Sequence, residues 1–250
     1  MKLFLKRLGA YLIDIILVSL VATLLSTNKY INKDYEKYTN VYDEYVEKYN
    51  EYDRYLKKID NYYEDKKISQ NEYEKLLEYG KENTLELEDA YENKKISEKE
   101  YDKILESLDK RYLEIDNSYS YKLLKYSIIP TIINVMCILL YFVVIQYYFN
   151  GQTVGKKLMK IRVAKNNEKG LNIFNFLLRS LIVNEVFFNI CNIIFLIVLS
   201  KNNYIIYNKI IYTVTYIFEM VIIFTIIFDK NNRGLHDYIC NTKVIEDKKG

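Results

Sequence analysis

Four long apolar runs are separated by polar segments along this chain, and each run approaches the length of a membrane-spanning helix. The runs cover residues 8–27, 124–149, 171–200 and 204–228. About 20 consecutive apolar residues are enough to cross the hydrocarbon core of a bilayer as a helix. The pattern therefore predicts a multi-pass membrane protein.

The third run carries more polar positions than the others, with Arg179, Asn184 and Glu185 inside it. We interpret residues 171–183 as an amphipathic segment at the membrane interface and residues 183–200 as the span itself. This interpretation gives four spans in total.

Two residue types bear on the continuity of the helices in the spans. Pro130, the only proline of the chain, predicts a kink near the start of the second span. No glycine follows Gly9 within the spans, so we expect them to lack the broken helices of secondary transporters. A permeation path would then require an oligomer.

Between the first two spans, residues 28–123 form a polar block with a helical repeat of tyrosines. Its a/d positions, in steps of three and four, are Tyr35, Tyr38, Tyr42, Tyr45, Tyr49, Tyr52, Leu56, Ile59 and Tyr63. They predict a coiled-coil-like helix over about 33–66. Tyrosine suits a partly hydrated interface, because its ring is buried while its hydroxyl keeps a partner. We favour helix packing over a ligand or cell-wall platform as the role of these rings.

An internal repeat follows in the polar block. YEDKKISQNEYEKLLE at 63–78 matches YENKKISEKEYDKILE at 91–106. Each copy contains Ser-x-x-Glu, the pattern of a capping box, and this predicts helices over about 70–93 and 98–122.

Three helices in alternating directions would end far from the membrane, which leaves the chain path open. Either the first helix folds back near Asn50 or Asn61, or one capping box marks a bend instead of a reversal.

The distribution of charge also separates the polar block, residues 28–123, from the rest of the chain. Residues 28–123 hold 25 acidic and 18 basic residues, whereas the rest of the chain is strongly basic. The three cysteines lie outside this block, and His236 is the only histidine, so no disulfide framework or two-histidine metal site is available. Since no nucleophile–base pair or cofactor motif is present, we expect neither an enzyme nor a cofactor, and no nucleic-acid binding.

The short basic segments indicate orientation, because Lys and Arg favour cytoplasmic loops. The loop 150–170 carries six basic residues against one acidic residue, and the N-terminus and the tail from Asp229 are also basic. We expect both termini and this loop in the cytoplasm and residues 28–123 outside. The abundance of Lys, Asn, Ile and Tyr indicates an AT-rich genome, so we expect the plasma membrane of a bacterium.

GQTVGKKLMKIRV, residues 151–163, invites comparison with a phosphate-binding loop. Only three residues separate Gly151 from Gly155, and Lys157 stands where that loop needs Ser or Thr. We reject nucleotide binding and predict a tight turn followed by a basic amphipathic segment on anionic lipid headgroups. The turn consists of Gly151, Gln152, Thr153, Gly155 and Lys156.

The tail motif RGLHDYICNTKV begins at Arg233 and contains the pair His236–Asp237. A His–Asp pair can ligate a metal, but such sites need further ligands and the chain has no second histidine. We favour a structural turn tied by polar side chains and expect no metal.

Ionisable residues inside the spans are more informative, because a charge at the centre of a span costs roughly 2.5–3.5 kcal/mol and normally faces a partner or water. The carboxyl candidates are Glu219, Asp14 and Glu185, and the available cations are Arg7, Arg179 and Lys209. They are either proton or ion sites, or ion-paired groups that hold the bundle together.

Asp14 makes the first run an unusual span, and with no clean cleavage site it favours a retained helix over a signal peptide. Arg7 lies about 10.5 Å away along the helix axis, too far for an ideal direct salt bridge. We predict that Asp14 contacts the 151–163 loop or the His236–Asp237 pair, in a polar cluster at the cytoplasmic face.

Together these pieces resemble the RDD family of bacterial membrane proteins, named for one arginine and two aspartates. The matching positions are Arg7 and Asp14 in RLGAYLIDIILV, Asp237 in RGLHDYICNTKV, the GQTVGKKLMKIRVAKNNEKG loop and Arg179. The resemblance covers roughly 1–27 and 124–245. Val154 stands where the family commonly has proline, Glu185 lies near a frequent acidic position, and the 28–123 block is a long insertion. Some members have been linked to sodium–proton exchange or other transport.

We therefore expect an all-α protein, with a four-helix transmembrane bundle and an extracytoplasmic helical domain inserted between the first and second spans. Residues 1–27 and 124–245 would form the membrane domain, 28–123 the inserted domain and 246–250 a charged tail. The expected role is transport, with Asp14, Glu219 or Glu185 as proton sites, in the lipid bilayer and within a homo-oligomer. The alternative is a membrane-anchored interaction protein whose outer helices bind a partner or an envelope polymer.

Overall fold

Most of the chain is helical in the computed structural model, which describes residues 2–65, 98–166 and 170–247. Two compact units are present: a membrane unit, Met1–Tyr35 with Ser127–Gly250, and a tyrosine-rich unit, Glu36–Tyr126. The described elements, in chain order, are α1 (Lys2–Ser26), α2 (Tyr35–Asp65), α4 (Glu98–Tyr126), α5 (Ile128–Leu139), the π-helix η1 (Leu140–Ile145), α6 (Gln146–Tyr148), α7 (Val154–Leu158), β1 (Ile161–Lys165), α8 (Ile173–Val183), α9 (Val186–Val198), α10 (Lys201–Phe228), α11 (Leu235–Ile239) and β2 (Thr242–Glu246).

Three helical segments of the membrane unit are long and apolar enough to cross a bilayer: Leu3–Ser26, Ile128–Tyr148 and Lys201–Phe228. Their outer faces leave large apolar side chains exposed, as surfaces that meet lipid do; examples are Leu12, Leu20 and Leu24 on α1 and Ile206, Ile210 and Phe224 on α10. These segments match the first, second and fourth predicted spans.

The third apolar run, residues 171–200, is broken. Helices α8 and α9 bend by 64° at Asn184–Glu185, close to the predicted boundary at 183, and together they pass as one further candidate span. Glu185 produces the break by adopting the left-handed conformation, with φ +54°. The expectation of unbroken helices is therefore wrong, because a non-glycine residue takes the backbone conformation that normally favours glycine.

The start of the second span also differs from the expectation. Helix α4 ends at Tyr126 and α5 begins at Ile128, so the interruption lies at Ser127 and not at Pro130. Pro130 occupies the first turn of α5, where backbone N–H groups have no intrahelical acceptor and a proline is tolerated.

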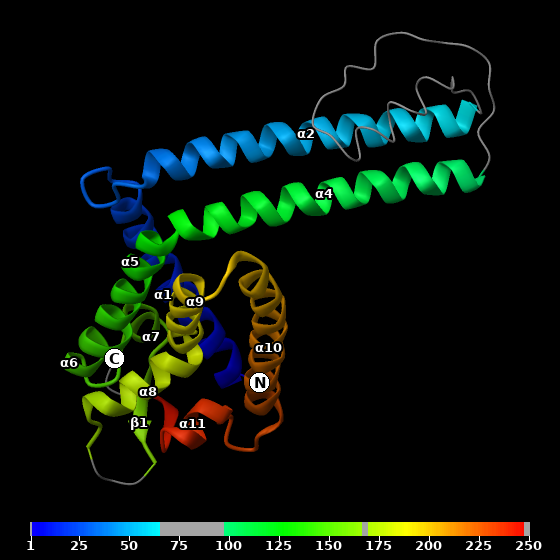
Figure 1. Ribbon diagram of the computed structural model, residues 1–250. Helices are drawn as coiled ribbons and strands as arrows, with labels where there is room; N and C mark the ends of the chain where they lie inside the picture. The colour runs from blue at the N-terminus through cyan, green and yellow to red at the C-terminus, as the bar shows by residue number, and fades with distance from the viewer. Residues whose placement is uncertain (1, 66–97, 167–169, 248–250) are drawn as a thin grey trace. The chain divides into compact units, whose positions relative to one another are not determined.

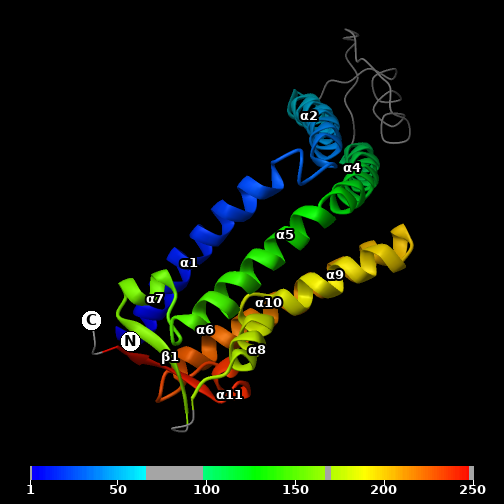
Figure 2. The ribbon, with the colours of Figure 1, turned by 90° about the vertical axis from the view of Figure 1, so that its left-hand side faces the viewer.

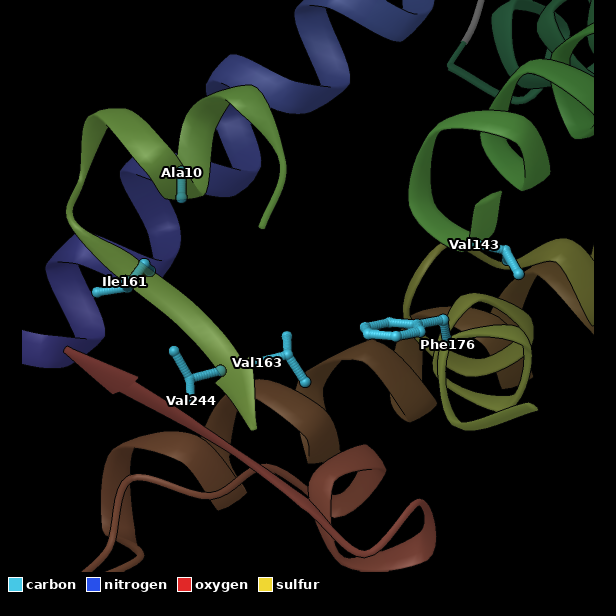
Figure 3. Packing of buried hydrophobic residues seen from close by; sticks show 6 residues of the cluster. All are labelled: Ala10, Val143, Ile161, Val163, Phe176 and Val244. Atoms are coloured by element: carbon cyan, nitrogen blue, oxygen red, sulfur yellow. The ribbon is translucent and has the colours of Figure 1, made fainter. Parts of the chain in front are cut away.

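A two-stranded antiparallel ribbon was not anticipated by the all-α prediction. Strands β1 and β2 pair with Val163 opposite Val244. Their buried positions alternate with half-buried ones, so one face of the ribbon is apolar. Figure 3 shows that this face joins Ala10, Val143 and Phe176, from α1, η1 and α8, in one buried cluster with Ile161, Val163 and Val244. The segment predicted to lie on lipid headgroups thus packs in part against protein.

The ribbon gathers segments distant in sequence at one end of the membrane unit. The start of α1, helix α7, strand β1 and the C-terminal segment lie together there (Figure 2). Lys6 forms an ion pair of 2.5 Å with Glu246, which ties α1 to β2. The three basic segments of the membrane unit therefore share one side.

Within the tyrosine-rich unit, α2 and α4 pair in an antiparallel arrangement (Figure 1). Tyr45 donates a hydrogen bond to Asp116, and Tyr52, farther along α2, donates to Asp109, which is earlier on α4. Tyr112 packs against the ring of Tyr52 with centroids 4.9 Å apart. Tyr45 and Tyr52 thus pack toward α4 while their hydroxyls keep partners, whereas Tyr42 and Tyr49 of the predicted seam are 48 % and 44 % exposed.

The predicted helices of this unit are confirmed where the structure describes them. Helix α2 matches 33–66 and is continuous through Asn50 and Asn61, so the proposed reversal there is wrong. Helix α4 matches 98–122 and continues to Tyr126. The predicted helix over 70–93 falls on residues outside the described ranges.

Replacing Tyr52 by Phe is expected to destabilise the helix pair locally by about 1 kcal/mol, the contribution of one hydrogen bond. Burial and the Asp109 partner raise the pKa of Tyr52 to about 12, which reflects how firmly the hydroxyl holds its proton. Hydrogen exchange of the α2 amides around residue 52 should quicken roughly fivefold. Tyr42→Phe is the matched control, since that ring is 48 % exposed; equal effects of the two changes would contradict the prediction.

Candidate functional site

Asp14 is fully buried and accepts hydrogen bonds from two other segments of the membrane unit. The Tyr141 hydroxyl donates at 2.6 Å, the Gly155 backbone N–H donates at 2.7 Å, and the Thr153 hydroxyl donates to the other carboxylate oxygen. Lys156 Nζ stands 3.7 Å from the carboxylate. The predicted contact between Asp14 and the 151–163 loop is therefore confirmed, and every neighbour named here is a donor.

The loop reaches Asp14 because its local sequence allows an unusually close approach to α1. Thr153 caps α7 by accepting from the Lys156 backbone N–H. A Cβ on Gly155 would lie 2.2 Å from the Ala10 carbonyl oxygen, so only glycine fits there. Gly151, with φ +89°, makes the preceding turn, and Gln152 donates to Asp247 at 2.8 Å. The predicted turn therefore holds the 151–163 loop tightly against α1.

Asp237 is the centre of a second buried cluster, built from α1, α8 and the tail. Arg7 pairs with it at 2.7 Å, Arg179 pairs with the other carboxylate oxygen, and Thr242 donates at 3.2 Å. Burial alone raises the pKa of Asp237, but Arg179, His236 and Arg7 together hold it well below the usual range. The motif residues therefore lie in two clusters. Arg7 forms its ion pair with Asp237, and Asp14 belongs to the other cluster.

His236 and Arg233 complete the tail side of this cluster. Arg233 donates to the Asp237 carbonyl oxygen at 3.3 Å and lies over the Tyr238 ring at 4.1 Å. His236 Nε2 stands 3.2 Å from a nitrogen of Arg7. Burial, reinforced by Arg179, lowers the pKa of His236 to about 3, so its ring is neutral. Nε2 of His236 also lies 3.4 Å from a carboxylate oxygen of Asp237.

These contacts fit the interpretation of the tail motif as a turn tied by polar side chains. Among the residues that the structure describes, no group of three His, Cys, Asp or Glu is placed to hold a metal ion.

Glu185 and Glu219 face each other across the break in the third candidate span. Both carboxyl groups line the same cavity, and Tyr11 of α1, which also lines it, lies close enough to interact electrostatically with both. Glu185 lies at the αL position itself, and Glu219 is exposed on α10.

One cavity of about 470 Å³ connects these groups between α1, α8 and α10. Its basic side is lined by Arg7, Lys156, Arg179 and His236, and its acidic side by Asn184, Glu185 and Glu219. Asp14 and Asp237 lie behind the basic side and do not line the cavity. The structure thus brings most predicted polar residues to one space, and it separates those that line the space from those that hold its wall.

Burial has a marked effect on Lys156 within this wall. It lowers the pKa of Lys156 to about 8, although the nearby Asp14 carboxylate acts in the opposite direction. The ammonium also stands 5.5 Å from the centroid of the Phe142 ring. The positive charge of Lys156 is therefore less firmly held than that of a solvent-exposed lysine.

Sequence reasoning missed several residues of these clusters. Tyr141 lies in an apolar run, where the pattern predicts that an aromatic ring faces lipid. Thr242 lies in a strand that was not predicted. Asn184 was noted only as an interruption. No pattern in the sequence distinguishes these polar groups from surface positions.

Comparison with known families gives one finding: the model described as RDD family matches residues 118–241. The match covers all of α5 to α11 and the last turns of α4, and it begins after Arg7 and Asp14. Comparison with curated proteins and with solved structures gave no match.

Proposed function

Because this chain belongs to the RDD family of membrane proteins, we propose that its membrane unit moves a small solute or ion across the bilayer, coupled to protons. The observation that carries the proposal is that two carboxyl groups, Glu185 and Glu219, line one cavity between membrane helices. Ionisable groups at such positions are costly and typically mark an ion or proton path.

The helix break supports the same role. In secondary transporters, discontinuous helices form binding sites within the membrane, because unwound backbone and helix ends supply polar groups there. Here Glu185 occupies the break between α8 and α9, so one of the two cavity carboxyl groups lies at the discontinuity itself. Since one chain already forms a cavity between its helices, a permeation path does not require an oligomer.

Within this proposal, Asp14 holds the 151–163 loop in place and does not transfer protons. Its carboxylate lies behind the cavity wall and accepts three hydrogen bonds from the loop and from Tyr141. Of the three carboxyl groups proposed from the sequence, Glu185 and Glu219 remain the candidates for proton transfer.

We also propose the topology that the basic segments support. They meet on one side of the membrane unit, and positive residues favour the cytoplasm, so both termini and the 150–170 loop would face inward. Residues 28–123 would then lie outside a bacterial plasma membrane. A partner-binding role for this block would need surfaces other than the tyrosine seam, because Tyr45, Tyr49 and Tyr52 already pack between helices.

Replacing Glu219 by Gln is expected to abolish proton-coupled flux, because an amide neither releases nor accepts a proton. The measurement uses full-length protein in liposomes with a trapped pH dye, an imposed pH gradient and candidate solutes added outside. Glu185→Gln should act alike, since both carboxyl groups are needed for the pair. Glu246→Gln is the matched control, because its carboxylate pairs with Lys6 and lies outside the cavity lining. Wild-type flux in both cavity variants would remove the pair from the mechanism.

A further inference from the structure

We propose that the cavity binds a small zwitterion, with the ligand's carboxylate at Arg7, Lys156 and Arg179 and its ammonium group at Glu185 and Glu219. This rests on the proposed function, because it names the class of solute that the transport site would take. Three features of the cavity carry it: the charge of each end, the unpaired polar atoms and the length.

The basic end of the cavity carries a net positive charge. Arg7, Lys156 and Arg179 line it, and the carboxylates behind them, Asp14 and Asp237, leave one positive charge uncompensated. Within the described residues, the polar contacts of the Lys156 ammonium are Thr153 Oγ1 at 3.3 Å and the Asp14 carboxylate at 3.7 Å. An ammonium has three N–H donors, so this side chain retains capacity for a ligand carboxylate.

His236 lines the same end. The residue is 2 % exposed, and within the described part of the chain its Nδ1 has no hydrogen-bond partner. A buried polar atom without a partner is costly, and a ligand or a water that reached it would satisfy it.

The acidic end offers mainly acceptors to a ligand. Asn184 is 8 % exposed, its amide nitrogen donates to Ser180 Oγ at 3.1 Å, and its Oδ1 has no partner among the described residues. With the carboxyl groups of Glu185 and Glu219 on the same side, three side-chain acceptor groups line this end. A ligand ammonium has three N–H donors and matches this set.

Ammonium binding also accounts for coupling to protons. A positive charge beside two carboxyl groups favours the ionised form of both. A proton held by either carboxyl group then leaves to the solvent as the ammonium enters, so one proton is exchanged for one ligand.

The length of the cavity selects among zwitterions. Glu219 and Ile226 both line it and stand seven residues apart on α10, about 10.5 Å along the axis. Ile226 lies at the basic end, because Ile226 Cγ1 and His236 Cε1 both approach the position that a Gly234 Cβ would take, at 2.7 and 2.6 Å. Ile222 lines the cavity between Glu219 and Ile226 on α10. An extended chain with terminal charges, such as 6-aminohexanoate, fits better than a compact α-amino acid.

The test is calorimetric titration of purified full-length protein with 6-aminohexanoate, hexanoate and hexylamine. Hexanoate and hexylamine each lack one of the two charges and serve as matched ligands. We expect the zwitterion to bind at least about tenfold more tightly than either, a difference of about 1.4 kcal/mol. The dependence of the heat on buffer ionisation should report release of one proton per ligand.

Two variants separate the ends of the site. Lys156→Met should abolish the preference for the zwitterion over hexylamine, and Glu219→Gln the preference over hexanoate and the proton release. Thermal melting of each variant shows whether it is folded, and Met keeps most of the volume of Lys. Glu246→Gln should bind like the wild type.

The outcomes distinguish this inference from the proposed function. Equal binding of the three ligands, or no binding of the zwitterion by folded protein, overturns the inference, whatever the liposome assay gives. Zwitterion binding with proton release but no flux in liposomes upholds the site and overturns transport.

Discussion

Replacing Asp237 by Asn is expected to lower the free energy of unfolding of the membrane unit by about 3–5 kcal/mol, because it leaves two buried guanidinium groups without their counter-charge. Arg7 and Arg179 both pair with this carboxylate, and their side chains are only 10 % and 12 % exposed. The measurement is thermal unfolding in detergent, followed by a thiol-reactive dye that reports exposure of buried Cys240. A fall in the melting temperature of roughly 10 °C corresponds to this loss.

Glu246→Gln provides the matched carboxylate-to-amide change at a surface ion pair. Glu246 has a side chain 53 % exposed, so its pair with Lys6 is screened by solvent, and the change should cost less than about 1 kcal/mol. If the two variants melt alike, the Asp237 cluster does not hold the unit together.

The response to acid follows from the same cluster. The pKa of Asp237 is depressed in the folded protein, so its contribution is complete above the unfolded value of 3.8 and is lost only as pH falls through the lower folded value. The difference in stability between wild type and Asp237→Asn should therefore stay constant between about pH 5 and about pH 8. A difference that shrinks at pH 5 would contradict the pairing.

The sequence predicts the first of the two clusters well because chain topology limits which segments share a membrane face. A carboxylate in the inner half of a span can only meet other inner segments, and Asp14 meets the 151–163 loop. The pairing of Arg7 with Asp237 is harder to predict from the sequence, because 230 residues separate them. Helical periodicity places residues on faces but does not say which faces meet.

Two further features lacked a usable signal. Strands β1 and β2 are five residues each and alternate apolar with charged positions, so in a basic context they read as amphipathic surface. The break at Glu185 depends on a left-handed backbone, which sequence patterns normally assign to glycine or asparagine. Both features are fixed by tertiary packing: the ribbon by its apolar face and the break by the helices that meet at the cavity.

Replacing Gly155 by Ala is expected to destabilise the membrane unit by about 3 kcal/mol, combining a steric clash with loss of a hydrogen bond to a charged group. The new Cβ would lie 2.2 Å from the Ala10 carbonyl oxygen and 2.9 Å from Asp14 Oδ1. The Ala10 contact is with the backbone of α1 and cannot relax by side-chain rotation, so the loop must move away from α1. The bonds that Gly155 and Thr153 donate to Asp14 would weaken together. Thermal unfolding with the same dye measures the loss.

Gly9→Ala is a control on the facing helix with the opposite expectation. Its Cβ would meet the Cε of Met159 at 3.0 Å, and this flexible end can shift. Alanine also favours a helix over glycine by roughly 0.5–1 kcal/mol, so Gly9→Ala should leave stability unchanged or slightly raised. Hydrogen exchange of the amides over 153–158 should quicken in Gly155→Ala alone. If both variants behave alike, the loop does not clasp α1, and a loop held by lipid headgroups would again be the better description.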